Sequence, residues 1–294
     1  QLNGYYDEFD FVSGIYWFNE EGSNRQGADS SFNGGGNLLE LDQETTSRAV
    51  FVNLGYGVTD DLRISGGVRY TKDEKIATAN VGIGPFTSQD DWNELSFELS
   101  ANYTLENGLN FYGSVQSGYQ SGQFPARPFC LFGDPLCFVA SDNITAVNYE
   151  LGLKGQVTDD FSMSVAIFNT EYEDLPYQVS TTSEGGFDTS NLVVEQTSRG
   201  IEWESTLYFS ENFKVHTSLG YMDVDVTEQD GIKPVAPLTP DLTASISPSY
   251  EFELAGGATI NTRIDYSFRS DMYGEPSSDP GRLTEIDSRE LVNF

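Results

Sequence analysis

Residues 94–105 read Glu-Leu-Ser-Phe-Glu-Leu-Ser-Ala-Asn-Tyr-Thr-Leu, with an apolar side chain at every odd position and a polar one at every even position. A two-residue period places all the apolar side chains on one face of an extended strand, whereas a helix needs spacings of three and four residues. This stretch therefore predicts a β-strand that has one apolar and one polar face.

The same period recurs along the whole chain, so we expect about twelve strands and an all-β fold. The predicted ranges are 7–18, 46–58, 62–72, 92–105, 109–120, 145–157, 161–180, 191–209, 213–226, 240–253, 258–270 and 284–294. Tight turns alternate with long polar connections, which we place at 19–45, 73–91, 121–144, 181–190, 222–238 and 271–283. This order predicts an antiparallel up-and-down meander in one domain.

Composition excludes several classes of protein. The chain has 294 residues and a formal net charge of −31, so it lacks the basic surface that nucleic-acid binding requires. Aromatic residues make up 13% of it, which is too many for a disordered chain. An α-helical membrane protein is excluded because no uninterrupted apolar run approaches the ~20 residues of a spanning helix.

Alternation alone does not distinguish a soluble barrel from an outer-membrane barrel, but three features favour the membrane. About twelve long strands would enclose an interior too wide for side chains to fill. The polar faces carry charges in mid-strand, at Glu98, Lys154, Glu202, Glu204, Arg263 and Asp265. Aromatic residues on the apolar phase gather near strand ends, at Tyr56, Tyr70, Tyr103, Tyr119, Phe209, Tyr221, Tyr250, Tyr266 and Phe268. We therefore expect a transmembrane β-barrel; a soluble, acidic β-sandwich lectin is the other possibility.

Candidate chemistry is sparse. Cys130 and Cys137 flank a Gly-Asp-Pro turn and are expected to form a disulfide, which indicates an oxidising compartment. The alternatives are free thiols or half of a metal site, but His216 is the only histidine and no metal or other cofactor is expected. His216 is interpreted as a polar lumen residue. No nucleophile–base arrangement stands out, so we do not expect an enzyme.

Several segments resemble one known family, the TonB-dependent outer-membrane receptors. The strands at Phe111–Phe124 and Asn148–Lys154 are similar to the family's YxSxSxGYKSGGF and NYELGxK motifs. Further similar segments, in the family's order, are Gly67–Lys75, Ala166–Leu175, Gly200–Glu204 and Leu219–Tyr221. Together these segments span most of the chain.

The resemblance implies a Gram-negative outer membrane, a barrel of about 22 strands and an N-terminal plug that couples transport to TonB. Residues 1–294 would then be a partial barrel domain, a fragment without the plug or the terminal strands. Outer-membrane lipid and lipopolysaccharide are further expected partners, and nucleic acid is not.

The function that this resemblance implies is uptake of a scarce nutrient, above all a ferric siderophore. Candidate ligand-binding residues, chosen by position near the outer ends of strands, are Tyr112, Gln116, Gln120 and Arg127. Aromatic rings and arginine suit a chelate that carries aromatic groups and negative charge. The alternative is a passive porin or a surface-adhesion barrel without a plug.

Overall fold

The computed structural model describes residues 1–28, 37–80, 84–125, 138–183, 186–229, 231–276 and 284–294. Strands, turns and irregular connections make up all of these ranges. Within them, no helix has the length and apolar character needed to cross a membrane. The predicted all-β class is confirmed.

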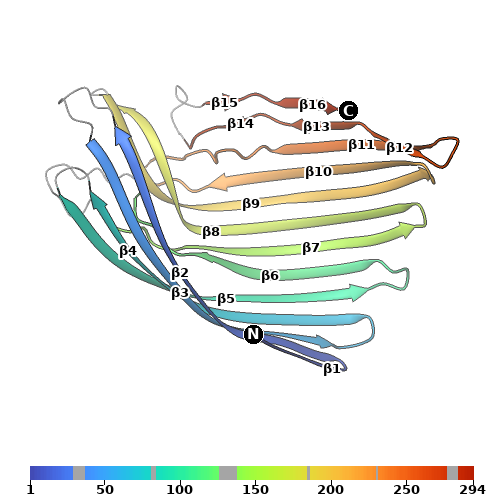
Figure 1. Cartoon of the computed structure of the whole chain (residues 1–294), viewed down its shortest axis with the longest axis horizontal. Coiled ribbons are helices and arrows are strands. Elements are labelled where there is room, and N and C mark those ends of the chain that lie inside the picture. The colour runs from blue at the N-terminus through green and yellow to red at the C-terminus, as the bar shows by residue number, and fades with distance from the viewer. Residues whose placement is uncertain (29–36, 81–83, 126–137, 184–185, 230, 277–283) are drawn as a thin grey trace. The chain divides into compact units, whose positions relative to one another are not determined.

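The strands from β2 to β11 are long, and the strands follow one another in the order of the chain (Figure 1). Their bounds are β1 Leu2–Tyr6, β2 Phe9–Ala28, β3 Asn37–Gly57, β4 Leu62–Asn80, β5 Pro85–Thr104, β6 Asn110–Gln120, β7 Ile144–Thr158, β8 Phe161–Ser183, β9 Gly186–Ser210, β10 Phe213–Val226, β11 Leu242–Glu253, β12 Thr259–Arg263, β13 Asp265–Arg269, β14 Met272–Tyr273, β15 Glu285–Ile286 and β16 Arg289–Asn293. The hydrogen-bonded path runs from β1 to β11 and then to β13 and β16, while β12 also pairs with β11. This path confirms the predicted up-and-down meander.

The predicted short turns are present. Val58 N–H donates to Leu62 O at 2.8 Å across the turn after β3. In the turn before β6, Gly108 N–H donates to Leu105 O, and its φ of +82° lies in the left-handed region that glycine tolerates. These turns are tight because their residues supply the required backbone conformations.

Several predicted strand ends are wrong. The connections expected at 19–45, 73–91 and 181–190 are instead largely strand, so β2–β3, β4–β5 and β8–β9 are longer hairpins than predicted. The alternation of apolar and polar residues ends where both faces of a hairpin are polar. The backbone hydrogen bonds between the two strands nevertheless continue. The strand expected at 7–18 begins at Phe9 as part of β2, because Asp7 at φ 38° lies in the turn between β1 and β2, and β1 itself was not predicted.

Contacts within the chain group its residues into two compact units. Unit 1 comprises Gln1–Tyr56, Ser65–Glu98 and Ser117–Thr145, and unit 2 comprises Gly57–Ile64, Leu99–Gln116 and Ala146–Phe294. Unit 1 buries a cluster around Trp92, and unit 2 buries one around Val194. Both clusters are small, because most large apolar side chains in each unit lie on an open face of the sheet.

That open face carries the apolar phase predicted from the sequence. Ile15 in unit 1 is 82% exposed and Leu151 in unit 2 is 50% exposed. Of the nine expected interface aromatics, the exposed ones are Tyr56, Tyr70, Tyr103, Phe209, Tyr221 and Tyr250. Tyr119 is an exception, since it packs against the buried cluster of unit 1. A face of this kind suits lipid, because a soluble protein would bury it.

The strand predicted at 258–270 is interrupted once, and the cause is a proline on its neighbour. β12 and β13 pair with β11 in one continuous register, which places Ile264 opposite Pro248. Ile264 N–H donates to Pro248 O at 3.1 Å, but proline has no N–H to return the bond. The ladder is therefore broken at Ile264.

Replacing this proline is expected to restore the ladder. In Pro248→Val, the new amide at position 248 can donate to the Ile264 carbonyl, which should stabilise this pair of strands by about 0.5–1.5 kcal/mol. Hydrogen exchange of that amide in the full-length protein is the measurement. An amide that exchanges as fast as one in an open turn would contradict this explanation of the break.

Candidate functional site

The polar face of unit 1 carries an arginine between aromatic rings. The Arg69 guanidinium carbon lies 5.1 Å from the centre of the Tyr16 ring and 5.9 Å from that of Phe51. Small partners make room for both rings, because Tyr16 is opposite Ala49 and Phe51 is opposite Gly14. A Cβ at Gly14 would lie only 2.7 Å from Cζ of Phe51. We call Tyr16, Phe18, Phe51 and Arg69 the arginine–aromatic patch.

The patch can bind a planar anion. Arg69 Nε–H donates to Thr71 Oγ1 at 3.0 Å, and within the described ranges no other side-chain bond of this guanidinium is recorded. Guanidinium carries five N–H donors in a planar fork, so donors remain for an anionic ligand. Tyr16 is 42% exposed, and its ring lies 6.4 Å from that of Phe18 at an interplanar angle of 16°. These rings offer stacking surface beside the cation.

Tyr112, a predicted ligand residue, is held against the sheet in unit 2. Its hydroxyl donates to Glu150 Oε1 at 2.8 Å, and Lys154 Nζ lies 5.2 Å from the centre of its ring. The ring lies over Gly152, where an added Cβ would be 2.4 Å from Cζ of Tyr112. Tyr112 therefore presents a ring face, whereas its hydroxyl is already bonded within the wall.

The other predicted site residues are placed less specifically. Gln116 and Gln120 share the even positions of β6 with Tyr112, and both are exposed. Arg127, Cys130 and Cys137 lie outside the described residues, so the binding role of Arg127 and the disulfide stay predictions.

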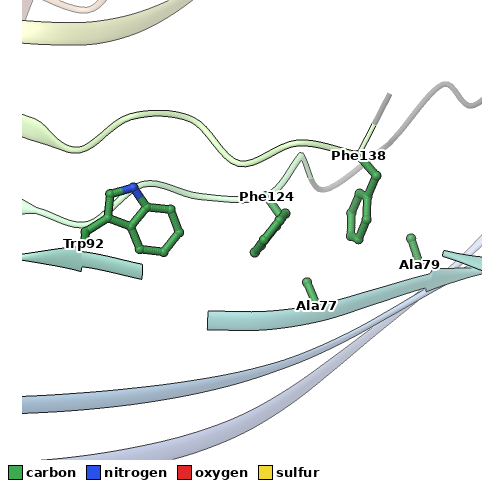
Figure 2. Close-up of a cluster of buried hydrophobic side chains, with 5 residues drawn as sticks. All are labelled: Ala77, Ala79, Trp92, Phe124 and Phe138. Atoms are coloured by element: carbon green, nitrogen blue, oxygen red, sulfur yellow. The ribbon is translucent and has the colours of Figure 1, made fainter. Parts of the chain in front are cut away.

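The two ends of the connection between β6 and β7 pack on the inner side of unit 1. We call residues 121–125 and 138–143 the stem. Figure 2 shows the Phe124 and Phe138 rings directed toward Ala77 and Ala79 of β4, with Trp92 of β5 beside Phe124. The two stem segments are also joined to each other, because Ser141 N–H donates to Gln123 O at 2.9 Å. The stem is thus fixed to β4 and β5.

A buried lysine fastens the stem. Lys75 is 8% exposed; its Nζ donates to Gly122 O at 2.7 Å and lies 5.5 Å from the centre of the Trp92 ring. It lies beyond the apolar band of β4, which ends at Tyr70 and gives way to polar side chains. Burial lowers the pKa of the Lys75 ammonium, while the Asp73 charge acts in the opposite direction.

His216 belongs to a row of polar side chains on the inner face of unit 2. Its Nδ1 lies 3.2 Å from Thr206 Oγ1, and it is opposite Ser247 on β11. Ser247 Oγ donates to Asp265 Oδ1 at 2.5 Å. In the part of the chain that the structure describes, no three His, Cys, Asp or Glu side chains are grouped to hold a metal ion.

The arginine–aromatic patch was not predicted from the sequence, although a signal for it existed. Tyr16, Phe18 and Phe51 are aromatic residues on the polar phase of their strands, where membrane anchoring does not explain them. Three strands had to be brought into register before these rings could be placed beside Arg69.

Comparison with known proteins identifies the family. The family model described as TonB dependent receptor-like, beta-barrel, matches residues 2–294. The chain belongs to this family. TonB-dependent receptors reside in the outer membrane of Gram-negative bacteria, and the strands of this receptor barrel carry the alternation that such a location requires.

Relatives of this TonB-dependent receptor barrel include the pesticin receptor of Yersinia pestis, which is 30% identical over 147 residues, or 47% of this chain and 21% of that protein. Among solved structures, the ferric yersiniabactin uptake receptor FyuA from Yersinia pestis has a TM-score of 0.78 at 19% identity, covering 98% of this chain and 43% of that one. The copper transporter OprC has a TM-score of 0.74 at 14% identity, covering 99% and 46%. The chain thus spans less than half the length of each.

Proposed function

We propose that this receptor barrel forms part of the wall of an outer-membrane transporter that takes up a ferric siderophore. The observation that carries the proposal is the arginine–aromatic patch on the inner face of unit 1. Family membership and the likeness to a ferric yersiniabactin receptor support the same class of ligand.

The chemistry of the patch distinguishes between the cargoes that related receptors carry. A bare copper ion would be repelled by Arg69, whereas a chelate with net negative charge would be attracted. Aromatic rings in the chelate would stack on Tyr16 or Phe18, and its oxygen atoms would accept from the guanidinium. The patch therefore fits an anionic, aromatic iron chelate better than a free cation.

The remaining partners follow from the same assignment. Energy would come from TonB through a plug domain of the full-length protein, as the family resemblance implies. The apolar outer face would contact outer-membrane lipid, and the polar extensions of the hairpins would lie among lipopolysaccharide head groups. Tyr112, Gln116, Gln120 and Arg127 stay candidate ligand contacts within this proposal.

Substituting Arg69 is expected to weaken ligand binding. In the full-length receptor, Arg69→Ala should raise the Kd for ferric yersiniabactin or ferric enterobactin, the two probes, by roughly 10- to 100-fold, because a charged hydrogen bond is lost. The Kd of Arg69→Lys should lie between the values for the wild type and Arg69→Ala. Lysine keeps the charge but lacks the planar set of N–H donors. Tryptophan fluorescence quenching measures the affinity.

The matched control is Arg25→Ala, which removes an exposed arginine that is paired with Glu40 at 3.5 Å. It should leave the affinity unchanged. Uptake of radiolabelled iron by iron-limited cells tests transport itself, with a protonophore added in a parallel sample. Uptake that continues with the protonophore would favour the passive porin, and no uptake of either chelate would overturn the siderophore assignment.

A further inference from the structure

The apolar face of unit 2 contains a hollow of about 670 Å³ that extends from Ile64 of β4 to β8. The smallest residues that line it are Gly113 and Ala101. The larger side chains of Leu99, Leu151 and Ile167 also line it. These three are exposed, so the hollow opens on the lipid-facing side. It exists because Gly113 contributes no side chain at an apolar position of β6.

We propose that this hollow holds one acyl chain of an outer-membrane lipid. The proposal rests on the outer-membrane location given under Proposed function. Most residues that line the hollow are apolar, and the polar ones are Ser100, Ser114, Glu150 and Asn169. By two-residue alternation, Ser100, Ser114 and Glu150 fall on the opposite phase of their strands, so Asn169 is the polar residue on the lipid-facing phase. In a bilayer, lipid tails are the apolar solvent that contacts such a face. If the hollow stayed empty, the side chains that line it would lose van der Waals contacts.

The register of the neighbouring strands shows that Asn169 lies at the edge of the apolar band. Ile167 is opposite Ile201, which in turn is opposite Tyr221. Two residues further along β8 on the same face, Asn169 is opposite Arg199. Arg199 Nε lies 3.5 Å from Asp223 Oδ2. A lipid tail in the hollow would thus reach the level where its head group meets water.

Shape argues against a second copy of the chain as the occupant. A two-fold dimer whose axis passes through this hollow would place hollow against hollow, since both partners present the same patch. Such an interface would enclose a void, and voids in packed interfaces are destabilising. A flexible acyl chain can instead lie along the backbone at Gly113 and fill the hollow.

Photo-crosslinking tests the proposal. The full-length receptor is reconstituted in vesicles that contain a phospholipid with a diazirine near the middle of one acyl chain, and crosslinked residues are identified by mass spectrometry. We expect crosslinks concentrated at residues 113–115 and at Leu151. In Gly113→Leu the new side chain fills the hollow, with Leu151 rotating away from a contact of 2.7 Å, and these crosslinks should be lost.

The matched control is Ala244→Leu, which adds a side chain at an apolar position of β11 outside the hollow. It should leave the crosslinks at Gly113 unchanged. Crosslinks spread evenly over the apolar face, or unaffected by Gly113→Leu, would overturn the proposal, as would crosslinks to a second protein chain. Binding of the ferric chelate is measured in the same vesicles, which need no TonB for this step: wild type that binds no ferric chelate but labels at Gly113 contradicts the proposed cargo and leaves the lipid site intact.

Discussion

Trp92→Ala is expected to release the stem from β4 and β5. Trp92 is 7% exposed and packs with Phe124 and beneath the Lys75 ammonium, so its removal leaves a cavity under the stem. Loss of a buried tryptophan costs about 3–5 kcal/mol, which would speed exchange of the protected amides by roughly a hundredfold to a few thousandfold. The Ser141 amide reports this opening, because it donates to Gln123 O.

Hydrogen exchange with mass spectrometry on the full-length receptor provides the measurement. Trp17→Ala is the control, since Trp17 is 69% exposed on another strand of unit 1 and should leave the Ser141 amide protected. Unchanged exchange in Trp92→Ala would show that the stem is held independently of this cluster.

Lys75→Met is expected to weaken the attachment of the same stem, chiefly through a lost hydrogen bond and in part through a lost charge beside Asp73. The substitution keeps much of the side-chain volume, but it removes the donor to Gly122 O and leaves the Asp73 carboxylate, itself 8% exposed, without its nearby cation. Loss of a hydrogen bond that a charged group donates costs about 1.5–3 kcal/mol. The same Ser141 amide should lose its protection.

A double variant separates charge from packing. In Lys75→Met/Asp73→Asn the carboxylate charge is also removed, so part of the lost stability should return; no recovery would contradict the electrostatic explanation. The pH dependence gives a second test. Because the folded state lowers the pKa of Lys75, the unfolded state binds more protons, and the denaturant midpoint of the wild type should rise as pH increases toward 10.5. Lys75→Met should lack this rise.

The strand pattern was predictable wherever one face meets lipid. In β5 the alternation from Leu95 to Leu105 identified the strand and its apolar face, and the open, exposed leucines of the structure agree. Beyond Tyr70 on β4 the outward side chains are Lys72 and Glu74, so apolar alternation stops although hydrogen bonding continues to Asn80. The alternation of apolar residues shows that one face of a strand is shielded from water. It gives no signal where both faces of the strand meet water.

The site was less predictable, because contacts between distant strands create it. Tyr112 was chosen by position, and the structure adds that its hydroxyl is bonded to Glu150. The Tyr16–Arg69 contact depends on two residues of different strands, and Lys75 reaches a carbonyl 47 positions away. Such neighbours follow from register, which a single sequence does not specify.

The pairing of glycine with an aromatic ring on the inner wall has an evolutionary consequence. A Cβ added at Gly152 would meet the Tyr112 ring, and one added at Gly14 would meet the Phe51 ring. Any larger residue at one of these glycines must displace the ring from the sheet. In the proposed transporter, a point mutation at Gly14 or Gly152 would then change the surface offered to the ferric chelate, while the strand ladder stays as it is. Receptors built on this wall can diverge in selectivity by exchanging glycine at a few fixed positions.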